Sequence, residues 1–188
     1  MSREFSQNIV SSGKIIDFHT HPYRHRGEFM GMYGEHFYLE PEQMPADLAE
    51  AGISVFCGSV IDSDHRGAME SFDRVREVND AALQLREKFG SAYVPGFHVY
   101  PAFLKESLHV ERMKKFPNLN LDISGTGLFR YGLLAALAQT VGSDRVLFGT
   151  DYPICNPGMY VQAVLGEHIP DEDKEKILFG NARRILGI

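Results

Sequence analysis

The stretch "IIDFHTHPY", residues 15–23, joins an apolar run to two histidines one residue apart and then to a proline. Successive side chains of a strand point to opposite faces, so His19 and His21 lie on one face and Thr20 on the other. Pro22 cannot donate a ladder hydrogen bond and ends the strand. The pattern therefore predicts a buried strand with two imidazoles at its carboxyl end.

Apolar runs of strand length alternate with helical patterns along the rest of the chain. We expect strands at residues 14–19, 53–60, 93–100, 119–124 and 145–150. Their hydrophobicity is continuous, which is typical of strands that are buried on both faces by helices. This alternation predicts an α/β fold built on a parallel sheet, with its chemistry at the carboxyl ends of the strands.

The intervening segments have helical spacing. We expect helices at residues 41–51, 69–89, 103–116, 131–141, 158–167 and 171–186, the last with a break at Gly180. Apolar residues recur at helical intervals in the second of these, which indicates a core-facing stripe. No repeat or linker interrupts the pattern, so we interpret residues 1–188 as a single domain.

Composition restricts the class of partner. The chain has 188 residues, 44% of them hydrophobic, which suffices for one core. A formal charge of −6 and a pI of about 5.7 argue against nucleic acid and favour a small-molecule substrate. We find no segment of secretory or membrane-spanning length, and we expect a cytoplasmic protein with no membrane partner. Cys57 and Cys155 are expected to be reduced thiols.

A second strand ends in the same way as the first. In "RVLFGTDYP", residues 145–153, an apolar run leads to Asp151 and then to a proline. Two neutral imidazoles and one carboxylate can hold a divalent cation, and imidazole suits Zn²⁺ better than Mg²⁺ or Ca²⁺. Two alternatives stay open: His19 and His21 as hydrogen-bonded residues without metal, and Asp151 as a helix cap or turn residue.

Four segments resemble a known family. "DFHTHP", "FPNLNLDISGTG", "SDRVLFGTDYPICNPG" and "KILFGNARRILG" are similar to segments of the amidohydrolase-related group of the amidohydrolase superfamily, which includes enzymes like aminocarboxymuconate-semialdehyde decarboxylase. The resemblance implies a (β/α)8, or TIM, barrel. It also implies that His19 and His21 bind the metal and that Asp151 is a ligand or a general base.

The chain is short for such a barrel, which normally runs to about 250 residues. The resemblance assigns the expected strands to barrel strands one, two, three, seven and eight, with a shortening between about residues 101 and 118. We therefore expect an incomplete barrel of about five parallel strands in the order 7-8-1-2-3. Its two edge strands would be open, and we expect them to associate as a homo-oligomer or to pair with each other.

Three further residues are candidates for the site. His98 ends an expected strand and Arg130 follows "DISGTG", and we assign both to substrate binding. Cys155 lies near Asp151 in the sequence; a thiolate binds zinc well, but a small buried residue is the preferred interpretation.

The leading hypothesis is a metal-dependent hydrolase with a divalent metal, most simply Zn²⁺, held by His19, His21 and Asp151. Asp151 would also accept a proton from a metal-activated water that attacks a small-molecule substrate. The alternatives are a decarboxylase, that is a carbon–carbon lyase, of the same family, and an inactive remnant that acts as a binding or assembly module.

Overall fold

The computed structural model describes residues 3–25, 40–61, 72–96, 117–125 and 131–188, and all structural statements concern these. The strands within them are β1 (Ile15–Thr20), β2 (Ile53–Gly58), β3 (Tyr93–Pro95), β4 (Leu121–Asp122) and β5 (Val146–Leu147). Each lies within or overlaps a predicted strand. The α/β class is therefore confirmed, while the total number of strands in the chain stays a prediction.

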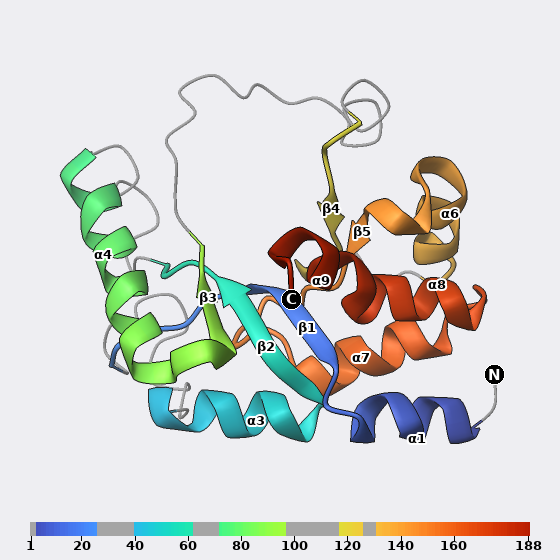
Figure 1. Ribbon diagram of the computed structural model, residues 1–188, viewed down its shortest axis with the longest axis horizontal. Coiled ribbons are helices and arrows are strands. Elements are labelled where there is room, and N and C mark those ends of the chain that lie inside the picture. The colour runs from blue at the N-terminus through green and yellow to red at the C-terminus, as the bar shows by residue number, and fades with distance from the viewer. Residues whose placement is uncertain (1–2, 26–39, 62–71, 97–116, 126–130) are drawn as a thin grey trace.

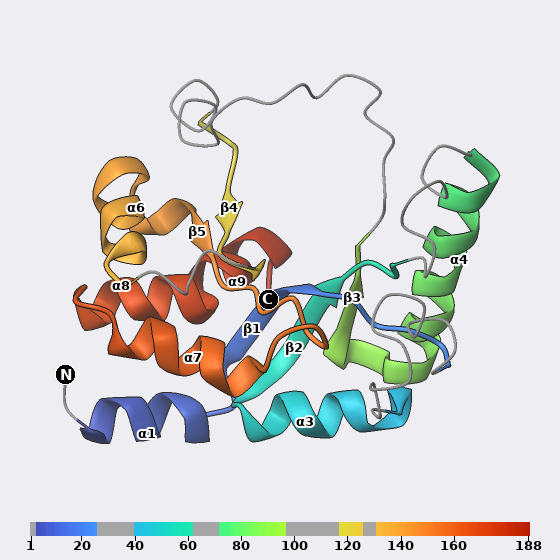
Figure 2. The same cartoon turned by 180° about the vertical axis from the view of Figure 1, so that it is seen from behind.

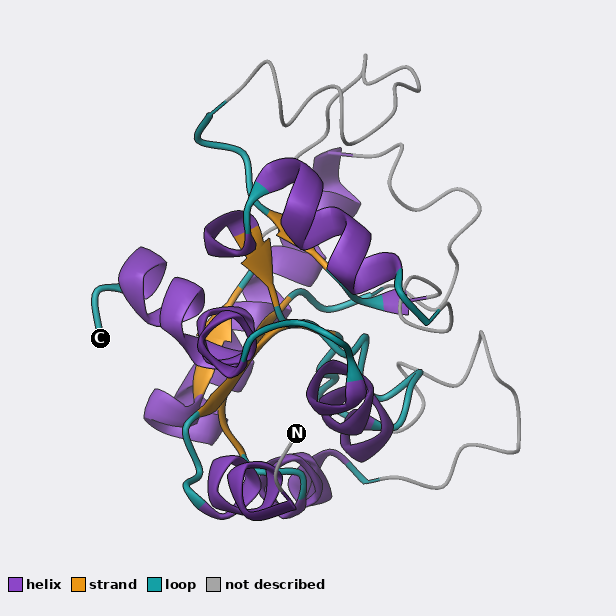
Figure 3. Ribbon diagram, turned by 90° about the vertical axis from the view of Figure 1, so that its right-hand side faces the viewer, coloured by secondary structure: helices purple, strands orange, loops and turns teal. Residues whose placement is uncertain are grey.

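Helices cover the strands on several sides (Figure 3). They are α1 (Arg3–Ser11), α3 (Met44–Glu50), α4 (Phe72–Phe89), α6 (Leu133–Val141), α7 (Pro157–Gly166), α8 (Asp171–Glu175) and α9 (Asn181–Leu186). Short 3-10 turns occupy Pro41–Gln43, Gly90–Ala92 and Ser143–Arg145. The predicted helix at 103–116 and the proposed site of shortening, except residues 117 and 118, lie outside the described residues.

Two predictions about the helices were incomplete. Helix α1 was not predicted. Its sequence is too short to indicate a helix by itself, and packing stabilises it, because Ile9 is buried in the main core. The predicted break at Gly180 is instead the end of a π-helical segment, Lys176–Gly180, which joins α8 to α9 without a gap. The Asn181 side chain then donates to the carbonyls of Ser143 and Val146, both at 2.8 Å, and fixes α9 against β5.

The strands are parallel and their order follows from the hydrogen bonds. β1, β2 and β3 form one ladder and β4 and β5 another. The segment after β5 runs along β1: Phe18 N donates to Phe148 O at 2.8 Å, and His21 N donates to Tyr152 O at 2.7 Å. The spatial order is thus β4-β5-β1-β2-β3, the order predicted from the resemblance.

The core has two parts because neighbouring residues of each strand face opposite sides. Ile15 and Phe56 contribute to a large cluster with side chains of α3, α4 and α7, whereas Ile16 and Cys57 join a smaller cluster with Ala182 of α9. Figures 1 and 2 show α9 and α7 on opposite sides of β1. Burial on both faces explains the continuous hydrophobicity of the strands. None of the helices in the described ranges is long and apolar enough to cross a membrane.

Candidate metal centre

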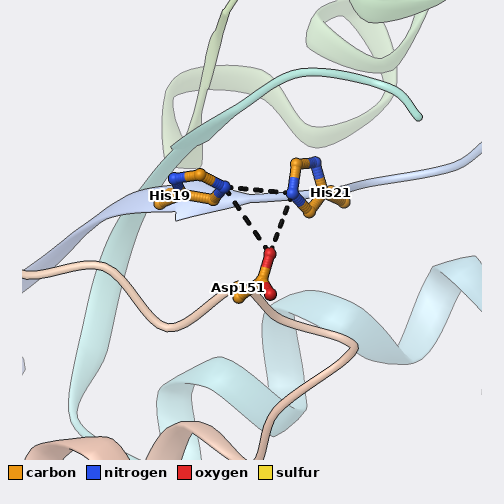
Figure 4. A group of neighbouring side chains, drawn as sticks. All are labelled: His19, His21 and Asp151. Carbon is orange, nitrogen blue, oxygen red and sulfur yellow. Dashed lines mark hydrogen bonds and ion pairs between the residues drawn. The ribbon is translucent and has the colours of Figure 1, made fainter. Parts of the chain in front are cut away.

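The two predicted halves of the site meet at the carboxyl ends of β1 and β5. His19 is near the end of β1, His21 follows the strand, and Asp151 follows β5. Asp151 N donates to His19 O at 2.8 Å, so the backbone itself holds the two segments together. Figure 4 shows the three side chains converging from the two segments.

The three potential ligand atoms are close to one another. His19 Nε2 and His21 Nε2 are 3.0 Å apart, and Asp151 Oδ1 lies 2.9 Å from His21 Nε2 and 3.5 Å from His19 Nε2. The side chains are 34%, 12% and 18% exposed for His19, His21 and Asp151, so solvent reaches the group. A cation and a small molecule can both approach it.

These separations fit one cation. Two ligands on a tetrahedral zinc with bonds of about 2.05 Å are about 3.3 Å apart, and ligands at right angles are about 2.9 Å apart. The observed 2.9 to 3.5 Å span this range. Within the described ranges, His19, His21 and Asp151 also form a group whose ligand atoms lie close enough together to hold a metal ion.

The second nitrogen of each ring has its own oxygen partner. His19 Nδ1 lies 3.2 Å from Asp122 Oδ1, and His21 Nδ1 lies 3.0 Å from the backbone carbonyl of Ser59. A metal-binding histidine usually donates its other N–H to a carboxylate or a backbone carbonyl. Both rings therefore have the environment of metal ligands, and neither Asp122 nor Ser59 was predicted as part of the site.

The Asp122 oxygen that faces His19 has two further donors. Ser124 N donates to Asp122 Oδ1 at 3.0 Å, and the Ser124 hydroxyl donates to the same oxygen. Burial acts to raise the pKa of Asp122, but the hydrogen bonds and charge of His19 and those of Ser124 hold it below the ordinary value. For His19, burial acts to lower the pKa, and the hydrogen bond and charge of Asp122 outweigh it and raise the pKa.

Asp151 has an uncommon backbone conformation. Its φ is +65°, in the left-handed region that non-glycine residues seldom adopt, although Asp and Asn tolerate it better than most. This conformation turns the chain after β5 and lets Asp151 face the histidines. Strained backbone of this kind is enriched at functional sites, which is consistent with a role for Asp151 beyond capping a helix.

A buried carboxylate lies beneath the histidines. Asp17 accepts hydrogen bonds from His19 N at 3.0 Å and Thr150 N at 3.1 Å, and from the Thr150 hydroxyl. Burial raises its pKa to about 7, although these hydrogen bonds act to lower it. Asp17 thus connects β1 to the segment after β5 next to the candidate metal centre, and the sequence pattern did not single it out.

A pocket of about 390 Å³ opens beside His19 and His21, at the ends of β1, β2 and β3. Its lining is mainly apolar or backbone, with Phe18, Cys57, Gly58 and Val94 among its residues. A pocket of this size takes a small molecule.

The remaining predicted residues are not part of the described centre. His98 and Arg130, assigned to substrate binding, lie outside the described residues. Cys57 and Cys155 are free thiols in the structure. Cys155 is half-buried, lies 3.5 Å from the Tyr160 hydroxyl, and does not join the group of metal-ligating side chains.

Comparison with known proteins agrees with the fold and the motifs. A family model described as amidohydrolase matches residues 101–188. No curated protein matches the chain. This match supports the resemblance that the motifs predicted over residues 101–188, which hold three of the four motifs and Asp151.

Solved structures with the same fold include two amidohydrolases and one decarboxylase. The 5-carboxyvanillate decarboxylase of Novosphingobium aromaticivorans, solved with manganese and 4-hydroxy-3-methoxy-5-nitrobenzoic acid, has a TM-score of 0.60 at 11% identity, over 93% of this chain and 96% of that one. A protein described as amidohydrolase II has a TM-score of 0.56 at 13% identity, over 93% and 100%. An amidohydrolase of Burkholderia multivorans with bound zinc has a TM-score of 0.50 at 14% identity, over 93% and 99%. At these identities the similarity establishes the fold.

Proposed function

We propose that this protein is a metal-dependent hydrolase of the amidohydrolase type, and that His19, His21 and Asp151 bind one divalent cation. One observation carries the proposal. Two Nε2 atoms and Asp151 Oδ1 face one another at 2.9 to 3.5 Å, while each Nδ1 has an oxygen within 3.2 Å. In the Nδ1–H tautomers that these oxygens favour, all three facing atoms are acceptors. Three acceptors at this distance repel unless a cation or a proton lies among them.

The residues of the chain have distinct roles in this proposal. A bound divalent cation would supply Lewis acidity that makes a water more acidic and polarises a carbonyl or carboxylate. His19 and His21 would bind it through Nε2, because their Nδ1 atoms are engaged behind them. Asp151 would bind through Oδ1, and its second carboxylate oxygen can accept a proton from the attacking water. The neighbouring pocket would hold the substrate.

We propose zinc as the metal, because two of the three ligands are imidazoles. Manganese is the alternative, since the neighbour from Novosphingobium aromaticivorans was solved with manganese and the one from Burkholderia multivorans with zinc.

A second candidate is decarboxylation. It is favoured by the fold similarity to 5-carboxyvanillate decarboxylase, at a TM-score of 0.60. In that case a bound cation would stabilise the negative charge left when the bond to the carboxylate breaks and carbon dioxide leaves. Asp151 would carry a proton to the aromatic carbon of the substrate that lost the carboxylate. Assays that follow carbon dioxide release from aromatic acids, beside assays of ester, lactone and amide hydrolysis, separate the two reactions.

We further propose that the chain is a single, incomplete barrel of about five strands that associates through its open edges. The support is the strand order, in which β3 and β4 are outermost and each pairs with one neighbour among the described residues. Light scattering should give the mass of a defined oligomer; a monomer at all concentrations would favour closure within one chain instead.

Metal analysis tests the proposed function. Protein purified without a histidine tag should contain about one equivalent of zinc or manganese, and both His19→Ala and Asp151→Ala should lose it. Asp144→Asn is the matched control, because Asp144 is an exposed aspartate outside the metal group. Wild-type protein that binds neither metal under gentle purification would favour the third hypothesis, an inactive remnant with a binding or assembly role.

A further inference from the structure

The contact between Asp122 and His19 crosses a strand. Asp122 is on β4 and His19 on β1, and β5 with its continuation lies between them. Neighbouring strands are about 4.8 Å apart, so the two backbones are about 9.6 Å apart, and the side chains must reach across the middle strand. Even so, His19 Nδ1 and Asp122 Oδ1 are 3.2 Å apart.

Gly149 makes this crossing feasible. It occupies the middle strand directly below the contact: a Cβ added there would lie 2.7 Å from His19 Cβ, 3.1 Å from Asp122 Oδ1 and 3.3 Å from Ser124 Cβ. A side chain at this position would push the two partners apart. The missing side chain of Gly149 and the carboxylate of Asp122 therefore belong to one arrangement.

The arrangement determines which ring nitrogen of His19 carries the proton. A neutral imidazole carries its proton on one nitrogen, and the hydrogen bond of that nitrogen decides which tautomer is present. An ionised carboxylate 3.2 Å from Nδ1 favours the Nδ1–H form, which leaves the Nε2 lone pair toward His21 and Asp151. His21 differs, because its Nδ1 faces the neutral carbonyl of Ser59.

We propose that Asp122 is a positioning residue for His19: reaching over Gly149, it holds the Nδ1–H tautomer and thereby presents Nε2 to the metal centre. The inference rests on the proposed function only for the metal; the tautomer of His19 is a property of the metal-free protein. Ser124 fixes the carboxylate in place by donating its N–H at 3.0 Å and its hydroxyl.

The experiment reads the tautomer and the metal separately. The ring nitrogen resonances of His19 are recorded in metal-free protein at a pH above the titration of the ring, in wild type, Asp122→Asn, Asp122→Ala and Asn120→Ala. Zinc affinity of the same proteins is measured by competition with a chelating dye. Asn120→Ala is the control, because its side-chain amide bonds the Asn118 carbonyl, outside the metal group.

Wild type should show His19 protonated on Nδ1. Asp122→Ala should lose this preference and bind zinc about 10- to 100-fold more weakly, the range typical for partners behind a metal ligand. Asp122→Asn should keep the tautomer, since the amide oxygen still accepts, with a smaller loss of affinity. Asn120→Ala should match wild type in both readouts.

Two results would overturn the inference. One is a wild-type His19 protonated on Nε2, which needs no variant to fold; the other is an Asp122→Ala protein with unchanged tautomer and unchanged zinc affinity. A wild-type protein that shows the Nδ1–H tautomer but binds no zinc would contradict the proposed function and leave the role of Asp122 in setting the tautomer intact.

Discussion

The two sides of the metal centre differ in chemistry. The side built from β4, β5 and β1 carries ionisable groups: His19, His21, Asp122 and Asp151. The side built from β2 and β3 contributes backbone carbonyls: Ser59 O lies 3.0 Å from His21 Nδ1, and Gly58 O accepts from Gly96 N at 2.6 Å and from the Tyr93 hydroxyl at 2.6 Å.

The first side has the groups that could bind a cation, and the second side forms the wall of the pocket. The candidate ligands come from segments far apart in the sequence, and their convergence depends on the contact between β1 and the segment after β5. The β2–β3 side is neutral and closely packed, and it suits an uncharged part of a substrate. Substitutions on the first side should change metal affinity, and substitutions on the second should change stability.

The largest effect is expected for Asp151→Asn. Asparagine tolerates the φ of +65° about as well as aspartate, so the backbone should persist while the negative ligand is lost. Zinc affinity should fall by more than about 100-fold, beyond the loss expected for a partner behind a ligand. Competition with a chelating dye measures it, with Asp144→Asn as the control.

If the Asp151→Asn protein bound zinc as tightly as wild type, the side with the ionisable groups would not be the side that binds the cation. A circular dichroism spectrum identical to that of wild type would show that the loss, where it occurs, is local to the site.

Gly58→Ala tests the neutral side. A Cβ at this position would lie 1.8 Å from the Thr20 carbonyl oxygen, which is backbone of β1 and cannot move away without breaking the β1–β2 ladder. We expect a loss of about 3 kcal/mol in the free energy of unfolding, at the upper end for overpacked sites. Urea denaturation measures this loss.

Zinc affinity of Gly58→Ala protein, measured where it remains folded, sharpens the comparison. A small change in affinity would support two separable sides. A loss as large as that of Asp151→Asn would mean that the end of β1 moves as one unit with β2.

Gly149→Ala should affect both properties moderately. The added methyl group would lie 2.7 Å from His19 Cβ, which moves only with the backbone of β1, and 3.1 Å from Asp122 Oδ1, which can rotate away. We expect about 1–3 kcal/mol of destabilisation and about a 10-fold loss of zinc affinity. The control is Gly166→Ala in α7, where an added Cβ meets nothing within 4 Å and should leave the metal centre unchanged.

Equal zinc affinities in Gly149→Ala, Gly166→Ala and wild type would show that the Asp122 contact is not needed for metal binding.

The sequence could predict that His19, His21 and Asp151 lie together, but not which residues support them. His19 and His21 lie at the end of an apolar run just before Pro22, and Asp151 lies at the end of another just before Pro153, which is a local pattern. Asp122 also stands at a strand end, inside "LDISGTG", yet its contact with His19 requires the order β4-β5-β1 and a glycine at 149. The role of the Ser59 carbonyl cannot be predicted from the sequence, because every residue has a backbone carbonyl.

The smallest effect is expected for the thiol of Cys57, on the neutral side. The residue is 5% exposed, and burial, followed by the nearby charge of Asp17, raises its pKa to about 12. The thiolate is the reactive form, so Cys57 should stay unmodified by a thiol reagent at neutral pH in the folded protein and react after unfolding. Cys57→Ala should leave zinc affinity within about twofold, because the sulfur belongs to the wall of the pocket and not to the metal group. Rapid modification of Cys57 in folded protein, identified by mass spectrometry of its peptide, would show that the β2–β3 side opens to solvent and that the neutral wall is not closely packed.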